Sequence, residues 1–119
     1  MRPMCLNNSI SVVIPVYNRQ KDLMVAVQSV FEQTYKPLEI IIIDDHSTVP
    51  IDIRELQNMN PLIPVSYIRN RRNLGAAKSR NIGIQQAKGN LIAFLDSDDY
   101  WLPKKLELQT ALFDSINDL

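Results

Sequence analysis

The sequence predicts an α/β fold with an open, mainly parallel sheet, in which strands and helices alternate as βαβαβαβα. Two observations predict it: short apolar runs alternate with segments of helical periodicity, and each apolar run is followed directly by a polar segment. Right-handed helical crossovers bring the carboxyl ends of parallel strands to one edge of the sheet, where such folds bind ligands. We expect the strand order 3-2-1-4, which places the polar segments around one crevice.

The apolar runs predicted to form strands are residues 10–16, 39–43, 64–69 and 91–95. The first, second and fourth runs are almost continuously apolar. This pattern is typical of parallel strands that are covered on both faces. We therefore expect these three strands to be well buried.

The interval after the first strand carries an apolar stripe at helical spacing, formed by Leu23, Ala26, Val27, Val30 and Phe31. Asn18 is the expected N-cap of this helix, because its side chain can accept from a free backbone N–H. A shorter helix is expected over residues 51–59, with Ile53, Leu56 and Met59 facing inward.

A third helix is expected over residues 75–88, with many small side chains that favour close packing on the sheet. Gly89 is expected to take a left-handed conformation and close it. The last helix is expected to open at Pro103. Its apolar positions on one face are Leu108, Ala111, Leu112 and Ile116.

Composition favours one compact domain over residues 10–119, preceded by an irregular leader over residues 1–9. Thirteen Lys and Arg balance thirteen Asp and Glu, so charge gives no support for binding nucleic acid or an anionic membrane. No apolar run approaches the roughly 20 residues that span a bilayer, and the leader does not resemble a signal peptide. With Cys5 as the single cysteine, we expect a cytoplasmic protein of a reducing compartment.

Three carboxylates follow the fourth strand within the segment Asp96-Ser97-Asp98-Asp99. Such a cluster repels itself unless a cation lies within it, and Mg²⁺ or Mn²⁺ prefers oxygen ligands. These ions usually take one or two protein carboxylates together with phosphate oxygens, so the segment fits a diphosphate ligand. The alternative is a solvated acidic turn, and spacing alone leaves both readings open.

Asp44 and Asp45 follow four consecutive isoleucines at the end of the second strand. A carboxylate there can accept a hydrogen bond from the imide N–H of a pyrimidine or from guanine. The alternative is that it caps the short helix that follows. His46, the only histidine, is expected to be an exposed turn residue rather than a metal ligand.

The segment after the third strand is rich in cations, and one or two of them could meet a diphosphate near the start of the third helix. They are Arg69, Arg71, Arg72, Lys78 and Arg80. The only glycines are Gly75, Gly83 and Gly89, and no Gly-Lys-Ser/Thr occurs. This excludes the dinucleotide-binding glycine fingerprint and the P-loop.

Four segments together resemble the successive motifs of family 2 glycosyltransferases, at residues 12–18, 42–47, 73–81 and 94–99. The resemblance extends from about Ser9 to about Leu106 in the order of the family's motifs, which makes it more specific than any one motif. Two positions depart from the family pattern: His46 stands where many members have glycine, and Leu74 stands where a second glycine is common. Both bear on loop shape.

The resemblance implies a nucleotide-sugar-binding domain of GT-A type. It assigns nucleotide binding to Pro15, Tyr17, Asn18, Asp45, Asn73, Arg80, Asp96 and Ser97. Among these, Pro15, Tyr17 and Asn18 would line the base pocket and Asp45 would accept from the base. Asp98, together with Asp96, would hold a divalent cation, Mn²⁺ or Mg²⁺.

The implied reaction is transfer of a sugar, with inversion, from a UDP-sugar to a hydroxyl of a saccharide or lipid-linked acceptor, at the inner face of the membrane. In the family the general base follows the acidic segment, so we expect this truncated chain to be the donor-binding portion and inactive alone. An exposed last helix and edge strand would then favour self-association.

Two alternatives come from other classes of protein. One is a non-catalytic nucleotide-binding or assembly module built on the same half of the fold. The other is a receiver domain that accepts a phosphoryl group, but that fold expects its acidic pair after the first strand. Here the pair follows the second strand.

Overall fold

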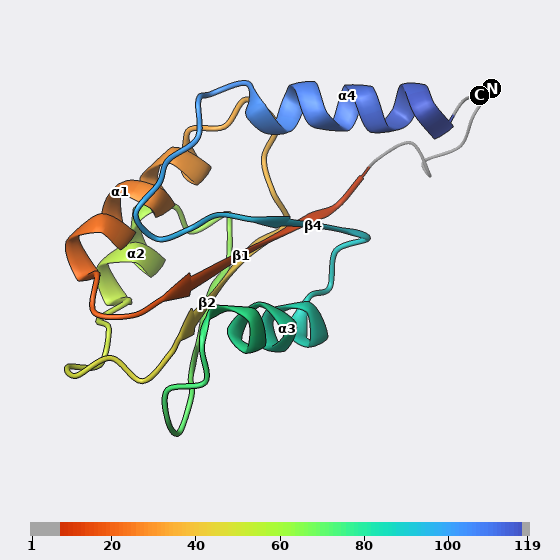
Figure 1. The fold of residues 1–119 in the computed structure, drawn as a ribbon. Coiled ribbons are helices and arrows are strands. Elements are labelled where there is room, and N and C mark those ends of the chain that lie inside the picture. The colour runs from red at the N-terminus through yellow and green to blue at the C-terminus, as the bar shows by residue number, and fades with distance from the viewer. Residues whose placement is uncertain (1–7, 118–119) are drawn as a thin grey trace.

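A computed structural model describes residues 8–117, and its centre is a parallel sheet of four strands. The strands are β1 (Ile10–Val16), β2 (Glu39–Asp44), β3 (Val65–Arg69) and β4 (Leu91–Phe94). They lie in the order β3-β2-β1-β4, and all three pairings are parallel, which confirms the predicted topology (Figure 1). Cys5 and most of the expected leader fall outside the described residues.

The helices are α1 (Gln20–Phe31), α2 (Arg54–Met59), α3 (Ala76–Gln86) and α4 (Lys105–Asn117). They form layers on both faces of the sheet (Figure 1). On one face, α1 and α2 pack in the main core with the amino-terminal part of α4. On the other face, α3 packs against β1 and β2. All five residues of the predicted apolar stripe of α1 are buried.

The two inner strands are buried along their whole length, as predicted, but the edge strand β4 is not. Ile92 and Phe94 are 36% and 42% exposed. The prediction of a strand covered on both faces is therefore wrong for β4. The reason is that α3 lies over β1 and β2, so this face of the edge strand is only partly covered by the described residues.

The apolar face of α4 also points away from the core. Leu108 and Leu112 are each 63% exposed, whereas Leu106 and Thr110 are buried and attach the helix to the sheet. The side chain of Ile116 lies outside the described residues. The helix begins at Lys105, two residues after the expected Pro103.

Two predictions about the helices α1 and α2 are wrong. Asn18 is not the N-cap of α1: that position is Arg19, and Asn18 Oδ1 instead accepts from the Thr48 N–H at 2.8 Å. The short helix α2 begins only at Arg54, and Met59 is 40% exposed rather than inward-facing. A helix this short buries one residue fully, Leu56.

Glycines allow the close packing expected of α3, but not in the expected way at Gly89. A Cβ on Gly83 would lie 2.3 Å from Val13 Cγ1, so α3 approaches β1 closely only because this position has no side chain. Gly89 is not left-handed. It is confined instead by the backbone at the start of β1, since a Cβ there would lie 2.5 Å from the Ser9 carbonyl oxygen and 2.8 Å from the Ser11 nitrogen.

Candidate functional site

A cavity of about 370 Å³ lies where the carboxyl ends of β1, β2 and β4 meet the start of α3. Its lining residues are Pro15, Val16, Tyr17, Arg19, Asp45, Ala76, Ser79, Asp96, Ser97 and Asp98. Segments that are far apart in the sequence therefore converge on one site, as the strand order predicted. Arg19 lies outside the four motif segments, and Ser79 lies within one of them but was assigned no role.

The segment after β1 forms one wall of this cavity. Tyr17 is 46% exposed and lines it, together with the buried Pro15. Asn18 follows in a left-handed conformation with φ 55° and lies outside the lining. It borders a separate hollow with Gln20 and Thr48.

Asp45 forms the floor, and its carboxylate already accepts three hydrogen bonds. Oδ1 accepts from the Leu74 N–H at 2.7 Å and from Asn70 Nδ2 at 2.9 Å, and Oδ2 accepts from the Gly75 N–H at 2.9 Å. Asp45 therefore does not cap α2. Its carboxylate fixes the loop that leads into α3. Asn73 Nδ2 donates to the backbone oxygen of Asp45 at 3.4 Å, and Asn73 does not line the cavity.

The environment of Asp45 keeps its side chain ionised. Burial by itself would raise the pKa of this carboxyl, but the hydrogen bonds from Leu74, Asn70 and Gly75 outweigh burial and hold the pKa below its ordinary value. The site therefore presents a negative charge at neutral pH. Oδ2 accepts one hydrogen bond whereas Oδ1 accepts two, so Oδ2 retains room for another donor.

The acidic segment after β4 divides its carboxylates between two sides. Asp96 and Asp98 line the cavity, whereas Asp99 lines a neighbouring groove, where its Oδ1 accepts from the Tyr100 N–H at 2.8 Å. Arg80 Nη2 forms an ion pair with Asp96 Oδ1 at 3.1 Å. Ser97 is buried beside them.

These carboxylates fit a cation that a ligand helps to hold. Among residues 8–117 no group of three Asp, Glu, His or Cys side chains is placed to hold a metal ion by itself. Mg²⁺ and Mn²⁺ are often bound by one or two carboxylates plus phosphate oxygens, so Asp96 and Asp98 match the number of protein ligands that such a cation needs. Arg80 would have to release Asp96, or share it, when the cation binds.

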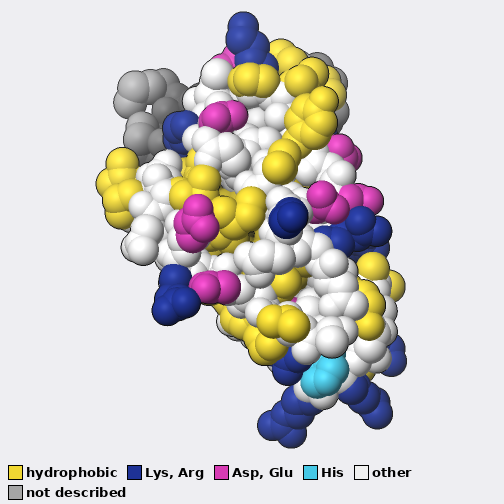
Figure 2. Space-filling view, turned by 90° about the vertical axis from the view of Figure 1, so that its left-hand side faces the viewer, with side chains coloured by type: hydrophobic (Ala, Val, Ile, Leu, Met, Phe, Trp, Pro, Cys, Tyr) yellow, Lys and Arg dark blue, Asp and Glu magenta, His cyan; other side chains and the backbone are white. Residues whose placement is uncertain are grey.

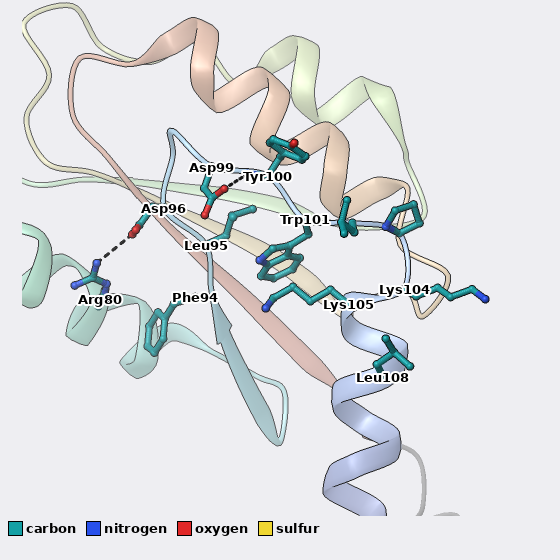
Figure 3. A pocket seen from close by; sticks show the side chains of 12 residues that line it. Arg80, Phe94, Leu95, Asp96, Asp99, Tyr100, Trp101, Lys104, Lys105 and Leu108 are labelled. Carbon is teal, nitrogen blue, oxygen red and sulfur yellow. Dashed lines mark hydrogen bonds and ion pairs between the residues drawn. The ribbon is translucent and has the colours of Figure 1, made fainter.

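The neighbouring groove measures about 990 Å³ and lies between β4 and the start of α4 (Figure 3). Phe94, Trp101 and Leu108 give it an apolar wall. Lys105 Nζ lies 5.6 Å from the centre of the Trp101 ring, a cation–π distance. Asp96 and Arg80 border this groove too, so it adjoins the acidic segment directly.

None of the predicted cations lines the cavity itself: Arg80 reaches it only through its ion pair with Asp96, and Arg69 contacts Asp44 and Ser47. Arg71, Arg72 and Lys78 are exposed and absent from its lining. Figure 2 shows Lys and Arg side chains gathered beside the only histidine, at the lower end of the view. His46 is exposed as expected, and its φ of 65° lies in the region that favours glycine.

Comparison with known proteins agrees with this geometry. The family model described as "Glycosyl transferase family 2" matches residues 11–118, which is nearly the whole chain. The chain belongs to glycosyltransferase family 2. This family 2 domain is therefore not a receiver domain, the alternative that the order of acidic residues had already disfavoured.

Similar proteins include two bacterial glycosyltransferases. An uncharacterized glycosyltransferase of Rickettsia felis is 42% identical over 111 residues, which cover 93% of this chain and 18% of that protein. The UDP-Glc:alpha-D-GlcNAc-diphosphoundecaprenol beta-1,3-glucosyltransferase WfaP of Escherichia coli is 42% identical over 100 residues, covering 84% of this chain and 39% of WfaP.

Among solved structures, TarS of S. aureus in complex with UDP-GlcNAc superposes with a TM-score of 0.77 at 28% identity, covering 90% of this chain and 31% of that one. The family 2 domain thus has the GT-A fold. It spans less than two fifths of the length of each of these proteins. No helix in the described part of the chain is both long and apolar enough to cross a membrane.

Proposed function

We propose that this chain binds the nucleotide-sugar donor of a glycosyltransferase that moves a sugar, with inversion and with help from a divalent cation, to an acceptor hydroxyl. The observation that carries the proposal is the single cavity in which an aromatic wall, an ionised aspartate and two further carboxylates meet at the strand ends. These groups match the parts of a nucleoside diphosphate in order: base, ribose and phosphates.

Uridine is the proposed base. WfaP is named for UDP-Glc, and the similar TarS structure contains UDP-GlcNAc. In this chain, Tyr17 and Pro15 would line the base pocket, and Asp45 Oδ2 would accept from the imide N–H. Asn18 and Asn73 lie outside the cavity lining, so we propose that they shape its loops and contact the nucleotide only at its margin.

Asp96 and Asp98 would hold the cation, Mn²⁺ or Mg²⁺, with Ser97 and Arg80 close to the ribose and diphosphate. When bound, the cation would neutralise the charge that develops on the departing nucleoside diphosphate. The protein groups bind and orient the donor. None of the residues lining the cavity is proposed as the general base, so we expect little transferase activity from this chain by itself.

The acceptor is proposed to be a saccharide or a lipid-linked saccharide, because WfaP is named for a diphosphoundecaprenol acceptor. Such an acceptor would place the whole enzyme at the cytoplasmic face of a membrane. A non-catalytic nucleotide-binding module would share the same cavity. Transfer by a longer form of the protein that includes this chain would distinguish the two.

The base contact is tested by replacing Asp45 with Ala. A charged hydrogen bond contributes about 1.5 to 3 kcal/mol, so calorimetric titration should show UDP binding weakened about tenfold or more. Inorganic pyrophosphate with Mn²⁺ is the control ligand, since it lacks the base and should bind both proteins alike. Unchanged UDP affinity in folded Asp45→Ala would mean that Asp45 only supports the loop before α3.

The cation site is tested by comparing Asp98→Asn with Asp99→Asn, because Asp99 faces the neighbouring groove. If Asp98 holds a cation that also holds the diphosphate, Mn²⁺ and UDP must strengthen each other's binding by the same factor. Asp98→Asn should abolish the Mn²⁺ enhancement of UDP binding, and Asp99→Asn should keep most of it. Equal UDP affinity with and without Mn²⁺ in the parent chain would contradict the proposal.

A further inference from the structure

Asp44, next to the proposed base contact, is fully buried and lines none of the cavities described above. Its Oδ1 accepts from both the backbone N–H and the hydroxyl of Ser47, at 2.9 and 2.6 Å. Its Oδ2 accepts from the Tyr67 hydroxyl at 2.5 Å and lies 3.5 Å from Arg69 Nε. Nothing in the proposed chemistry uses this carboxylate.

These contacts keep Asp44 ionised. Burial by itself would raise the pKa of Asp44, but the hydrogen bonds from Ser47, Tyr67 and Ile51 outweigh burial and hold the pKa below its ordinary value. Burial and the bond to Asp44 also raise the pKa of Tyr67 to about 12. Tyr67 therefore remains a protonated donor at neutral pH, and Asp44 remains an acceptor only.

The ionised Asp44 fixes the direction of the next hydrogen bond. Because a carboxylate has no proton to donate, the single hydroxyl proton of Ser47 must point to Asp44. The lone pairs of Ser47 Oγ then face outward and accept from the backbone N–H of Asn18 at 2.9 Å. A relay therefore runs from β2 through Ser47 to the segment after β1.

The residue at the end of this relay holds an uncommon backbone conformation. Asn18 has φ 55°, in the left-handed region that few residues other than glycine, asparagine and aspartate adopt. Two bonds from the neighbouring loop hold it: Ser47 Oγ accepts from its N–H, and its own Oδ1 accepts from the Thr48 N–H. The preceding residue is Tyr17, whose side chain lines the cavity.

We propose that Ser47 is a positioning residue for the nucleotide site, oriented by Asp44, and that it acts by fixing the backbone of Asn18 and so the aromatic wall at Tyr17. The inference rests on the proposed function for its link to nucleotide binding. The relay itself is a property of the free protein. Its two parts are therefore tested separately.

Two single hydroxyl deletions on the same carboxylate form the matched pair. Ser47→Ala removes the acceptor for the Asn18 N–H, whereas Tyr67→Phe removes a donor on the opposite oxygen of Asp44 and leaves the relay intact. Both should lower the free energy of unfolding, because Ser47→Ala removes the acceptor of the Asn18 N–H and Tyr67→Phe removes one donor from a buried carboxylate. Only Ser47→Ala should free the Asn18 N–H from its hydrogen bond.

The relay is measured by amide hydrogen exchange without any nucleotide. In Ser47→Ala the Asn18 amide should exchange about tenfold faster or more, after correction for global stability, while Tyr67→Phe leaves it unchanged. Asp44→Ala should act like Ser47→Ala, because the hydroxyl proton loses its fixed partner. Unchanged exchange in Ser47→Ala, or equal acceleration in Tyr67→Phe, would overturn the relay.

The link to the nucleotide is measured by calorimetry with UDP and with inorganic pyrophosphate. Coupling through such networks changes affinity by about two- to thirtyfold, and we expect about fivefold weaker UDP binding in Ser47→Ala. Pyrophosphate should be unaffected, and Tyr67→Phe should bind both ligands like the parent. In a double-mutant cycle, Asp44→Ala should add nothing to Ser47→Ala.

The outcomes separate this inference from the proposed function. If the parent chain fails to bind UDP, the proposed function fails, and hydrogen exchange still decides the relay. If the parent binds UDP and Ser47→Ala binds it equally well, the positioning role is overturned while the proposed function stands. If Asp44→Ala does not fold, the contrast between Ser47→Ala and Tyr67→Phe decides alone.

Discussion

Gly75 has a backbone conformation that other residues rarely adopt, with φ 92° and ψ 161°. Its N–H donates to Asp45 Oδ2, so this conformation aims a backbone donor at the site. A Cβ would meet nothing within 4 Å, which makes the cost of a side chain purely conformational. We expect Gly75→Ala to lower the free energy of unfolding by about 1–3 kcal/mol and to weaken UDP binding.

Denaturant unfolding measures that cost, and Ala77→Gly in α3 is the control. This control makes the reverse exchange, alanine to glycine, at an exposed helical position. It should lower the free energy of unfolding by only about 0.5–1 kcal/mol. If Gly75→Ala were as stable as the parent, residue 75 would not need its positive φ. The loop would then adjust without loss.

Single residues also show where sequence reasoning reaches its limit. The importance of Asp45 could be predicted from its place after a buried strand, but its partners could not. Two of them are the backbone N–H groups of Leu74 and Gly75. Every residue except proline has such a group, so the sequence does not indicate which of them will bind Asp45. Arg19 was missed for a similar reason, because an exposed arginine before a helix carries no specific signal.

At the scale of elements, the packing of α3 on β1 depends on one missing side chain. Gly83→Ala would place a Cβ 2.3 Å from Val13 Cγ1, and overpacking of this kind costs about 1–3 kcal/mol. We expect that loss in denaturant unfolding, and we expect Val13→Ala to compensate part of it in the double variant. Strictly additive losses would mean that the two positions do not compete for space.

The positions of the strands and helices were predicted closely, because apolar periodicity and the residues that end an element are local features of the sequence. What covers each face was not. An apolar stripe on α4 and an apolar run in β4 indicate that a face exists, but periodicity does not say whether it points inward. The exposure of both was expected only from the resemblance to a family of longer proteins, and that expectation is confirmed. Leu106 and Thr110 attach α4, while Leu108 and Leu112 face solvent.

For the whole molecule, this apolar surface predicts self-association. Phe94 is 42% exposed on an edge strand whose outer backbone groups are unpaired among the described residues, and the exposed leucines of α4 add to it. Sedimentation velocity should show a concentration-dependent rise in mass, which Phe94→Lys and Leu112→Lys each reduce. Val49→Lys, on an exposed loop, is the control and should change nothing. A monomer at every concentration would contradict the prediction.

The strand order has a consequence for how the chain reaches this fold. The inner strand β1 precedes the other three strands in the sequence, yet one of its neighbours, β4, follows all of them: Ile10 pairs with Leu91. Contacts between residues so far apart in the sequence form slowly, because the long loop must close before any pairing stabilises it. During synthesis on the ribosome, β1 therefore stays half-paired until β4 emerges, and this largely apolar strand is the segment that a chaperone would need to shield.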